Sequence, residues 1–151
     1  MKNNLILTFV VILGLTLSCG DDGTNQYQKE VITLDNITSG RPYSPAIRKD
    51  NMLFVSGQVA VNPETGQMIE GGIEDQTDQV LKNMKAIIDK AGFKMEDVVK
   101  CTVLLTDISH YGTMNSIYST YFPVDPPARK AFAVKDLPLG ALVEIDAVAV
   151  K

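Results

Sequence analysis

The sequence predicts an α/β (α+β) domain in which two helices cover one face of a mixed sheet, in the order β-β-α-β-α-β-β. Two observations lead to this fold class. Apolar residues alternate with a period of two in several short runs that end in turn residues. Between these runs, two longer segments have the spacing of three and four that is typical of an amphipathic helix. Strands and helices that follow one another in a short chain favour two packed layers.

Five runs are predicted as strands: residues 31–34, 51–61, 98–106, 131–134 and 141–150. In the second run, Leu53 and Val55 face one side of the sheet, while Phe54 and Ser56 face the other. The third run is apolar almost throughout, which is typical of a central strand. Turn residues at 62–66 and 137–140 separate these runs from their neighbours.

Two segments are predicted as helices. The first covers residues 73–91, has acidic residues in its first turn and is followed by Gly92 as a stop signal. The second begins at Ser109, which can act as its N-cap, and ends at Pro123. Their apolar stripes are Val80, Met84, Ile87, Ile88 and Ala91 in the first helix, and Met114, Ile117, Tyr118 and Tyr121 in the second.

The second face of the predicted sheet mixes apolar and polar groups. Its candidates are Phe54, Ser56, Gln58, Leu142, Glu144, Asp146 and Val148. A domain of this size has no second helical layer to cover them. We therefore expect oligomerisation to turn these faces inward and to place polar groups at subunit edges, where a small pocket can form.

The N-terminus is interpreted as a processing segment. Residues 5–17 are mostly apolar and follow Lys2, and about 13 residues suit a secretory signal better than a membrane span of ~20 residues. The small residue Ser18 before Cys19 resembles a bacterial lipobox, so residues 1–18 are predicted as a signal peptide and Cys19 as the lipidated residue. An ordinary secretory signal is the alternative. Residues 19–30 then form a flexible tether, and residues 31–151 form the domain.

The composition limits the partners and the chemistry. The net charge is −4 and no run of Lys or Arg exceeds two residues, which argues against nucleic-acid binding. Apart from Cys19 the only cysteine is Cys101, which lies in an apolar strand and is interpreted as a buried filler rather than a nucleophile. The sequence has no disulfide framework and no cysteine pair for a metal, so no metal site is expected.

Two charged residues stand out near the C-terminus. Arg129 follows a double proline and enters one apolar run, and Glu144 lies among the β-branched residues of the next. Charged residues at the edge of an apolar core need a partner. Arg129 is interpreted as holding the carboxylate of a small anionic ligand, with Glu144 acting on a water or a proton beside it. A surface charge near a turn and an ion pair with a lysine are the alternatives.

Four stretches carry a resemblance to a known family. They are GRPYS at 40–44, MLFVSGQ at 52–58 with VNP at 61–63, DVVK at 97–100 with NSIY at 115–118, and PPAR at 126–129 with VEIDAVA at 143–149. In this order and spacing, the chain resembles the RidA/YjgF family of reactive-imine deaminases. The resemblance covers nearly all of residues 31–151. It implies a chorismate-mutase-like fold and a homotrimer.

The resemblance also implies an activity and a set of site residues. Family members with the arginine hydrolyse enamines and imines such as 2-aminoacrylate to 2-oxo acids and ammonia without a cofactor, as 2-iminobutanoate/2-iminopropanoate deaminases do. Arg129 matches the arginine that grips the substrate carboxylate, and Glu144 matches the carboxylate that positions water. Tyr43 and Ser56 match groups that reach the pocket from an adjacent subunit, and Gly57 allows the backbone to approach the ligand.

Alternatives remain for the site and for the function. Tyr43 can simply pack under its proline-rich loop, Ser56 can be a small residue at a strand end, and Asp146 shares a strand face with Glu144. The single histidine, His110, is interpreted as a solvated residue at a helix start.

The chain departs from the family in two respects: Ala131 stands where many members carry cysteine, and export to the envelope, at the periplasmic face or cell surface, changes the substrate supply. A non-catalytic trimer that binds 2-oxo or amino acids is therefore the second hypothesis. Ribonuclease activity is disfavoured by the acidic charge balance.

Overall fold

The computed structural model describes residues 28–34 and 42–151 of the chain. The predicted signal peptide, Cys19, most of the predicted tether and the first two residues of the GRPYS stretch lie outside the described residues. Within the described ranges, no helix has the length and hydropathy that a membrane crossing requires.

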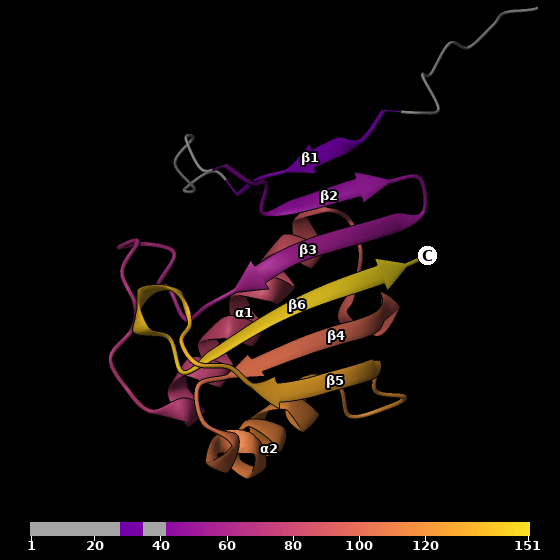
Figure 1. The fold of residues 1–151 in the computed structure, drawn as a ribbon. Helices are drawn as coiled ribbons and strands as arrows, with labels where there is room; N and C mark the ends of the chain where they lie inside the picture. Colours follow the sequence, from indigo (N-terminus) through magenta and orange to yellow (C-terminus); the bar gives the residue numbers. More distant parts are fainter. Residues whose placement is uncertain (1–27, 35–41) are drawn as a thin grey trace, which may run out of the picture.

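The described part of the chain forms a six-stranded mixed sheet with two α-helices on one of its faces (Figure 1). The strands are β1 (Glu30–Ile32), β2 (Ala46–Lys49), β3 (Met52–Gln58), β4 (Val98–Leu105), β5 (Ala128–Ala133) and β6 (Val143–Val150). The helices are α1 (Ile73–Lys90) and α2 (Tyr111–Tyr121). The predicted fold class is confirmed.

The strands lie in the order β1-β2-β3-β6-β4-β5, and only the β4–β5 pair is parallel. A parallel pair needs a crossover connection, and α2 lies in the connection between β4 and β5. This crossover places α2 against the edge of the sheet that β5 forms, as Figure 1 shows. The cavity described below lies between these two elements.

Strand β2 is absent from the sequence prediction. Two of its four residues are the basic Arg48 and Lys49, so its sequence has no apolar alternation. It forms a strand because β1 and β3 pair with it on both sides. Asp50, with a φ of 53°, makes the tight turn between β2 and β3, and therefore β3 begins at Met52.

The core lies between the two helices and the inner face of the sheet. In β6, the inward residues Val143, Ile145, Ala147 and Ala149 are almost fully buried, which confirms the predicted alternation. The predicted stripe of α1 is buried as well, and in α2 Met114 and Tyr118 are buried. The predicted N-cap of the second helix is wrong. The Asp107 side chain accepts a hydrogen bond from the Ser109 N–H in a 3-10 turn, and α2 begins at Tyr111.

The other face of the sheet carries most of the residues that the sequence assigned to it, together with Phe132 of β5. The predicted position of Gln58 is wrong, because the register shift in β3 sets Gln58 level with the buried Ile145. Phe54 is 43% exposed and Phe132 is 44% exposed. Glu144, Asp146 and Val148 are half-buried between the fully buried residues of β6. Neither α1 nor α2 covers this face, which we call the open face. Its large apolar residues are typical of a surface that packs against another protein chain.

Candidate functional site

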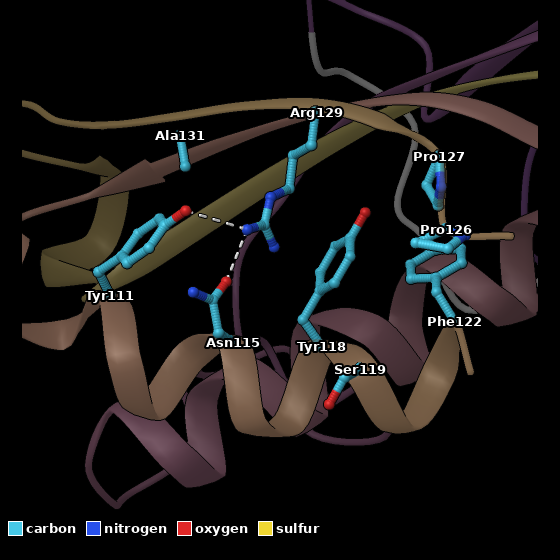
Figure 2. Close-up of a pocket in the computed structure, with 9 residues that line it drawn as sticks. All are labelled: Tyr111, Asn115, Tyr118, Ser119, Phe122, Pro126, Pro127, Arg129 and Ala131. Carbon is cyan, nitrogen blue, oxygen red and sulfur yellow. Dashed lines mark hydrogen bonds between the residues drawn. The ribbon is translucent and has the colours of Figure 1, made fainter. Parts of the chain in front are cut away.

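Arg129 is the second residue of β5, and its side chain extends towards α2 (Figure 2). The neighbouring residue on β4 is Cys101, whose side chain is buried under the helices, so the two share the helical side of the sheet. Arg129 Nη2 donates a hydrogen bond of 2.6 Å to Asn115 Oδ1 and approaches the Tyr111 hydroxyl at 3.4 Å. The guanidinium carbon also lies 4.5 Å from the centroid of the Tyr118 ring. Helix α2 therefore fixes the position of the arginine.

A cavity of about 410 Å³ lies between α2 and β5 beside this arginine. Its lining residues are Tyr111, Asn115, Tyr118, Ser119, Phe122, Pro126, Pro127, Arg129 and Ala131 (Figure 2). Arg129 is the only charged residue in this lining, and the remaining wall is mostly aromatic and proline side chains. A small anion with an apolar body matches this combination. Ala131 also lines the cavity and contributes a methyl group to the wall.

Glu144 lies in a second group of candidate residues, on the open face. The β3–β6 ladder shifts its register between Val55 and Gln58, so Ser56 and Gly57 lie at a β-bulge beside β6. A Cβ atom on Gly57 would overlap Glu144 Oε1. Glycine at position 57 therefore makes room for the carboxylate of Glu144.

The environment of Glu144 favours its neutral form. Burial raises the pKa of the Glu144 carboxyl, and the negative charge of Asp146 on the same face of β6 raises it further. A carboxylate with a raised pKa is a stronger base and accepts a proton from water more readily. Asp146 and Glu144 thus share a face of β6, as the sequence predicts, and the effect of Asp146 on Glu144 is electrostatic.

Ser56 ties the loop that carries Tyr43 to β3. Its hydroxyl donates a hydrogen bond of 2.7 Å to the Ser44 carbonyl, and its N–H donates one of 3.0 Å to the Pro45 carbonyl. Tyr43 itself is 52% exposed. The hydroxyl proton of Ser56 is thus engaged in fixing the loop in a single copy of the chain.

The structure divides the predicted site residues into two groups. Ser56, Gly57 and Glu144 lie together at the β3–β6 bulge. Arg129 lies in the cavity on the helical side of the sheet. The hypothesis that Glu144 acts beside the ligand of Arg129 is therefore not satisfied within one copy, and only two copies could bring these side chains to one ligand.

The other two residues that the sequence analysis weighed for chemistry, Cys101 and His110, lie in strand β4 and in a turn before α2. Burial, the largest influence, raises the pKa of the Cys101 thiol to about 11, which fits the interpretation of a buried filler rather than a nucleophile. His110 lies in the 3-10 turn that precedes α2. In the described part of the chain, no three His, Cys, Asp or Glu side chains are grouped so as to hold a metal.

Sequence reasoning missed the side chains that hold Arg129. Tyr111 was not singled out, Asn115 entered only as part of a motif, and Tyr118 was assigned to the core. A signal was present, because positions 111, 115 and 118 are spaced by four and three and so share one face of a helix. Only the tertiary structure shows that this face meets Arg129.

Comparisons with known proteins agree with the fold and with the motifs. Residues 33–151 match the model of the endoribonuclease L-PSP family. A RutC family protein of Pyrococcus horikoshii is 46% identical over 124 residues, which are 82% of this chain and 98% of the relative. The mouse 2-iminobutanoate/2-iminopropanoate deaminase is 46% identical over 73% of this chain and 82% of its own length.

A solved structure supports the same assignment. The YjgF gene product of E. coli is 36% identical and superposes with a TM-score of 0.75, with 81% of this chain and 98% of that chain covered. The family model matches most of the chain, and the relatives are matched over most of their length. The protein therefore belongs to the endoribonuclease L-PSP family, also called the RidA/YjgF family.

Proposed function

We propose that this protein hydrolyses small reactive enamines and imines, such as 2-aminoacrylate, to 2-oxo acids and ammonia without a cofactor. The observation that carries the proposal is the Arg129 guanidinium, held by Asn115 at 2.6 Å in an otherwise uncharged cavity of about 410 Å³. The names of relatives support it, since the mouse relative is a 2-iminobutanoate/2-iminopropanoate deaminase.

The proposed chemistry needs few groups. Arg129 binds the carboxylate through charge-assisted hydrogen bonds and so fixes the C=N carbon beside it. Glu144 accepts a proton from a water molecule as the water oxygen bonds to that carbon. Glu144 then returns this proton to the nitrogen, which gives a carbinolamine. The hydroxyl proton of the carbinolamine passes to the nitrogen as the C=O bond forms, so the C–N bond breaks and ammonia leaves with the 2-oxo acid as the other product. An enamine first gains a proton at its terminal carbon and loses one from its nitrogen, which gives the imine that enters this sequence. The raised pKa of Glu144 suits both proton transfers.

We propose further that the active unit is a homotrimer in which each site takes Arg129 from one copy and Glu144 from the next. The separation of these residues onto two faces of the sheet supports this arrangement. The exposed Phe54 and Phe132 give the open face the apolar surface that such an interface needs. Tyr43, Ser56 and Gly57 then belong to the half-site that carries Glu144.

The direct test is release of ammonia from imines that an amino-acid oxidase generates in the assay. The mature wild-type protein should accelerate release, and Arg129→Ala should lower kcat/KM by ~10²-fold or more, because charged hydrogen bonds contribute about 1.5–3 kcal/mol each. Arg129→Lys should restore little, since lysine lacks the planar fork. Arg48→Ala on β2 is the matched control, because it removes an arginine that is outside the cavity lining.

Two results would contradict parts of the proposal. If Arg129→Ala matched the wild type, Arg129 would have no part in the reaction. If the wild type bound 2-oxobutanoate but released no ammonia, the protein would be a binding module for small carboxylates instead of an enzyme.

We also propose that the chain is exported and anchored to the bacterial cell envelope by a lipid on Cys19. The proposal rests on the apolar residues 5–17 and the small residue before Cys19. In cells fed a clickable fatty acid, the wild type and Cys101→Ser should carry the label, and Cys19→Ser should not. An unlabelled wild-type chain in the soluble fraction would contradict the anchor.

A further inference from the structure

Tyr111 is the first residue of α2, and its hydroxyl lies beside the guanidinium of Arg129 (Figure 2). The oxygen is 3.4 Å from Arg129 Nη2, and the ring centroid is 5.7 Å from the guanidinium carbon. The side chain lines the cavity and is 41% exposed. The phenol is thus accessible from the cavity and next to its only charged group.

The hydrogen-bond directions determine what the Tyr111 hydroxyl has left to offer. Arginine has donors and no acceptor, so in its contact with Arg129 the Tyr111 oxygen accepts. The Asn115 carbonyl oxygen already accepts from the same arginine nitrogen at 2.6 Å. Asn115 and then Arg129 lower the pKa of Tyr111, as groups that donate towards a phenol oxygen do. The hydroxyl proton of Tyr111 therefore remains for a third partner.

The cavity indicates the charge of that partner. Its lining contains no Asp or Glu, and Arg129 supplies a positive charge. A group that accepts from both Arg129 and Tyr111 must present acceptor atoms to two neighbouring donors. A carboxylate does so, because it has two oxygens and about four acceptor positions.

We infer that Tyr111 is a second substrate-binding residue, whose phenol O–H donates to the substrate carboxylate that Arg129 holds. This inference takes the carboxylate class of ligand from the proposed function and adds a residue to its binding site. Asn115 is then a positioning residue, which holds Arg129 so that the remaining guanidinium donors and the phenol face the same ligand.

If Tyr111 instead blocked the ligand, Tyr111→Phe would change the binding affinity in the opposite direction. If its oxygen occupied the place of the ligand on Arg129, removing the hydroxyl would tighten binding. The contact of 3.4 Å is long compared with the 2.6 Å to Asn115, so we expect a carboxylate to displace it easily. The phenol then gives up its long contact with Arg129 Nη2 and donates its proton to the carboxylate. Tyr111→Phe therefore weakens binding.

The test measures binding of 2-oxobutanoate by calorimetry, so that it does not depend on turnover. Tyr111→Phe should raise the Kd about 10-fold, the effect of losing one hydrogen bond to a charged group. Ser116→Ala is the matched control, because it removes a hydroxyl from the same helix that lies outside the cavity lining and donates to the Gly112 carbonyl. The uncharged 2-oxobutanamide should bind weakly and equally to the wild type and to Tyr111→Phe.

The outcomes separate this inference from the proposed function. An unchanged or lower Kd for Tyr111→Phe overturns the inference, as does a wild type that binds no 2-oxobutanoate. Binding that responds to Tyr111→Phe in a protein without turnover leaves the inference standing and overturns only the proposed activity. With turnover, Tyr111→Phe should raise KM and leave kcat near the wild-type value, because the carboxylate contact is equal in the ground state and the transition state.

Discussion

The side chains of Arg129 and Glu144 lie on opposite faces of one β-sheet. In the sheet register, Arg129 is level with Cys101 on β4, which is level with Ala147 on β6. Ala147 is buried under the helices, and Glu144 lies three residues earlier on β6, so it points to the open face. A single copy therefore presents two half-sites rather than one complete site.

This geometry predicts complementation between two inactive variants. Arg129→Ala and Glu144→Gln each remove one half-site, and both should be inactive alone. When they are co-expressed and mix at random, a site is intact only if the Glu144→Gln chain supplies its Arg129 and the Arg129→Ala chain supplies its Glu144. About one quarter of the sites then meet this condition, so ammonia release should return to about one quarter of the wild-type rate. The double variant mixed with wild-type chains is the control for dilution. A mixture that stays inactive would show that both residues must come from the same copy.

Asn115 should control access to Arg129. In Asn115→Asp, the new carboxylate lies where Oδ1 now accepts from Arg129 at 2.6 Å, and it competes with the substrate for the guanidinium. We expect KM to rise at least ~10-fold with no fall in Tm, because the new ion pair replaces a neutral hydrogen bond. Asn115→Ala should raise KM less and should lower Tm. A KM for Asn115→Asp equal to that of the wild type would show that the ligand does not use Arg129.

A side chain at position 57 should displace the carboxylate of Glu144. The Cβ atom of Gly57→Ala would overlap the Glu144 carboxylate, so the carboxylate must move and activity should fall. The overlapping atoms belong to the end of a flexible side chain that can rotate away. The unfolding free energy should therefore fall by no more than ~1 kcal/mol, the low end of overpacking costs, as urea denaturation measures. Gly112→Ala in α2 is the control, because a Cβ atom on Gly112 would enter open space. This variant should change stability little or raise it.

A double-mutant cycle identifies the cause of the stability loss in Gly57→Ala. Truncation in Glu144→Ala removes the atoms that Gly57→Ala would meet, so the cost of Gly57→Ala should largely disappear in that background. An equal cost in both backgrounds would assign the effect to the backbone of the bulge instead.

Elements with a strong local pattern could be predicted from the sequence alone. The stripe of α1 and the alternation of β6 repeat often enough to be recognised without the fold, and both were placed within two residues of their observed limits. Strand β2 could not be predicted, because its pairing partners and not its residues make it a strand. The start of β5 was missed because Arg129 and Lys130 interrupt its apolar pattern, whereas its register with β4 extends to Ala128.

The composition of the site was easier to predict than its geometry. The motifs identified Arg129 and Glu144. However, the alternation within one strand does not tell whether its residues face the same side of the sheet as residues of another strand. That relation depends on the pairing of β4 with both β5 and β6. For the same reason, only the packing of α2 against Arg129 assigns Tyr111 and Asn115 to the site.

The pH dependence should report on Glu144. The proposed reaction needs this carboxylate ionised to accept a proton from water, and burial first and Asp146 second raise its pKa. Activity should therefore rise with pH along a limb above the ordinary range of a glutamate. Asp146→Asn removes the second cause alone, so the midpoint of the limb should move to lower pH, and rates across the acidic range measure this shift.

The same raised pKa predicts that stability depends on pH in the opposite direction to activity. Because the folded state binds this proton more tightly than the unfolded state, its contribution to stability is present below the unfolded pKa of a glutamate and is lost as the pH rises through the folded pKa. Glu144→Gln should therefore gain unfolding free energy relative to the wild type at pH 7, and gain less at pH 4, as urea denaturation at both values measures. Two results together would contradict this account: a midpoint of the activity limb that moves to higher pH in Asp146→Asn, and an equal gain in unfolding free energy for Glu144→Gln at pH 4 and pH 7. They would show that the ionisation of Glu144 controls neither the activity nor the stability.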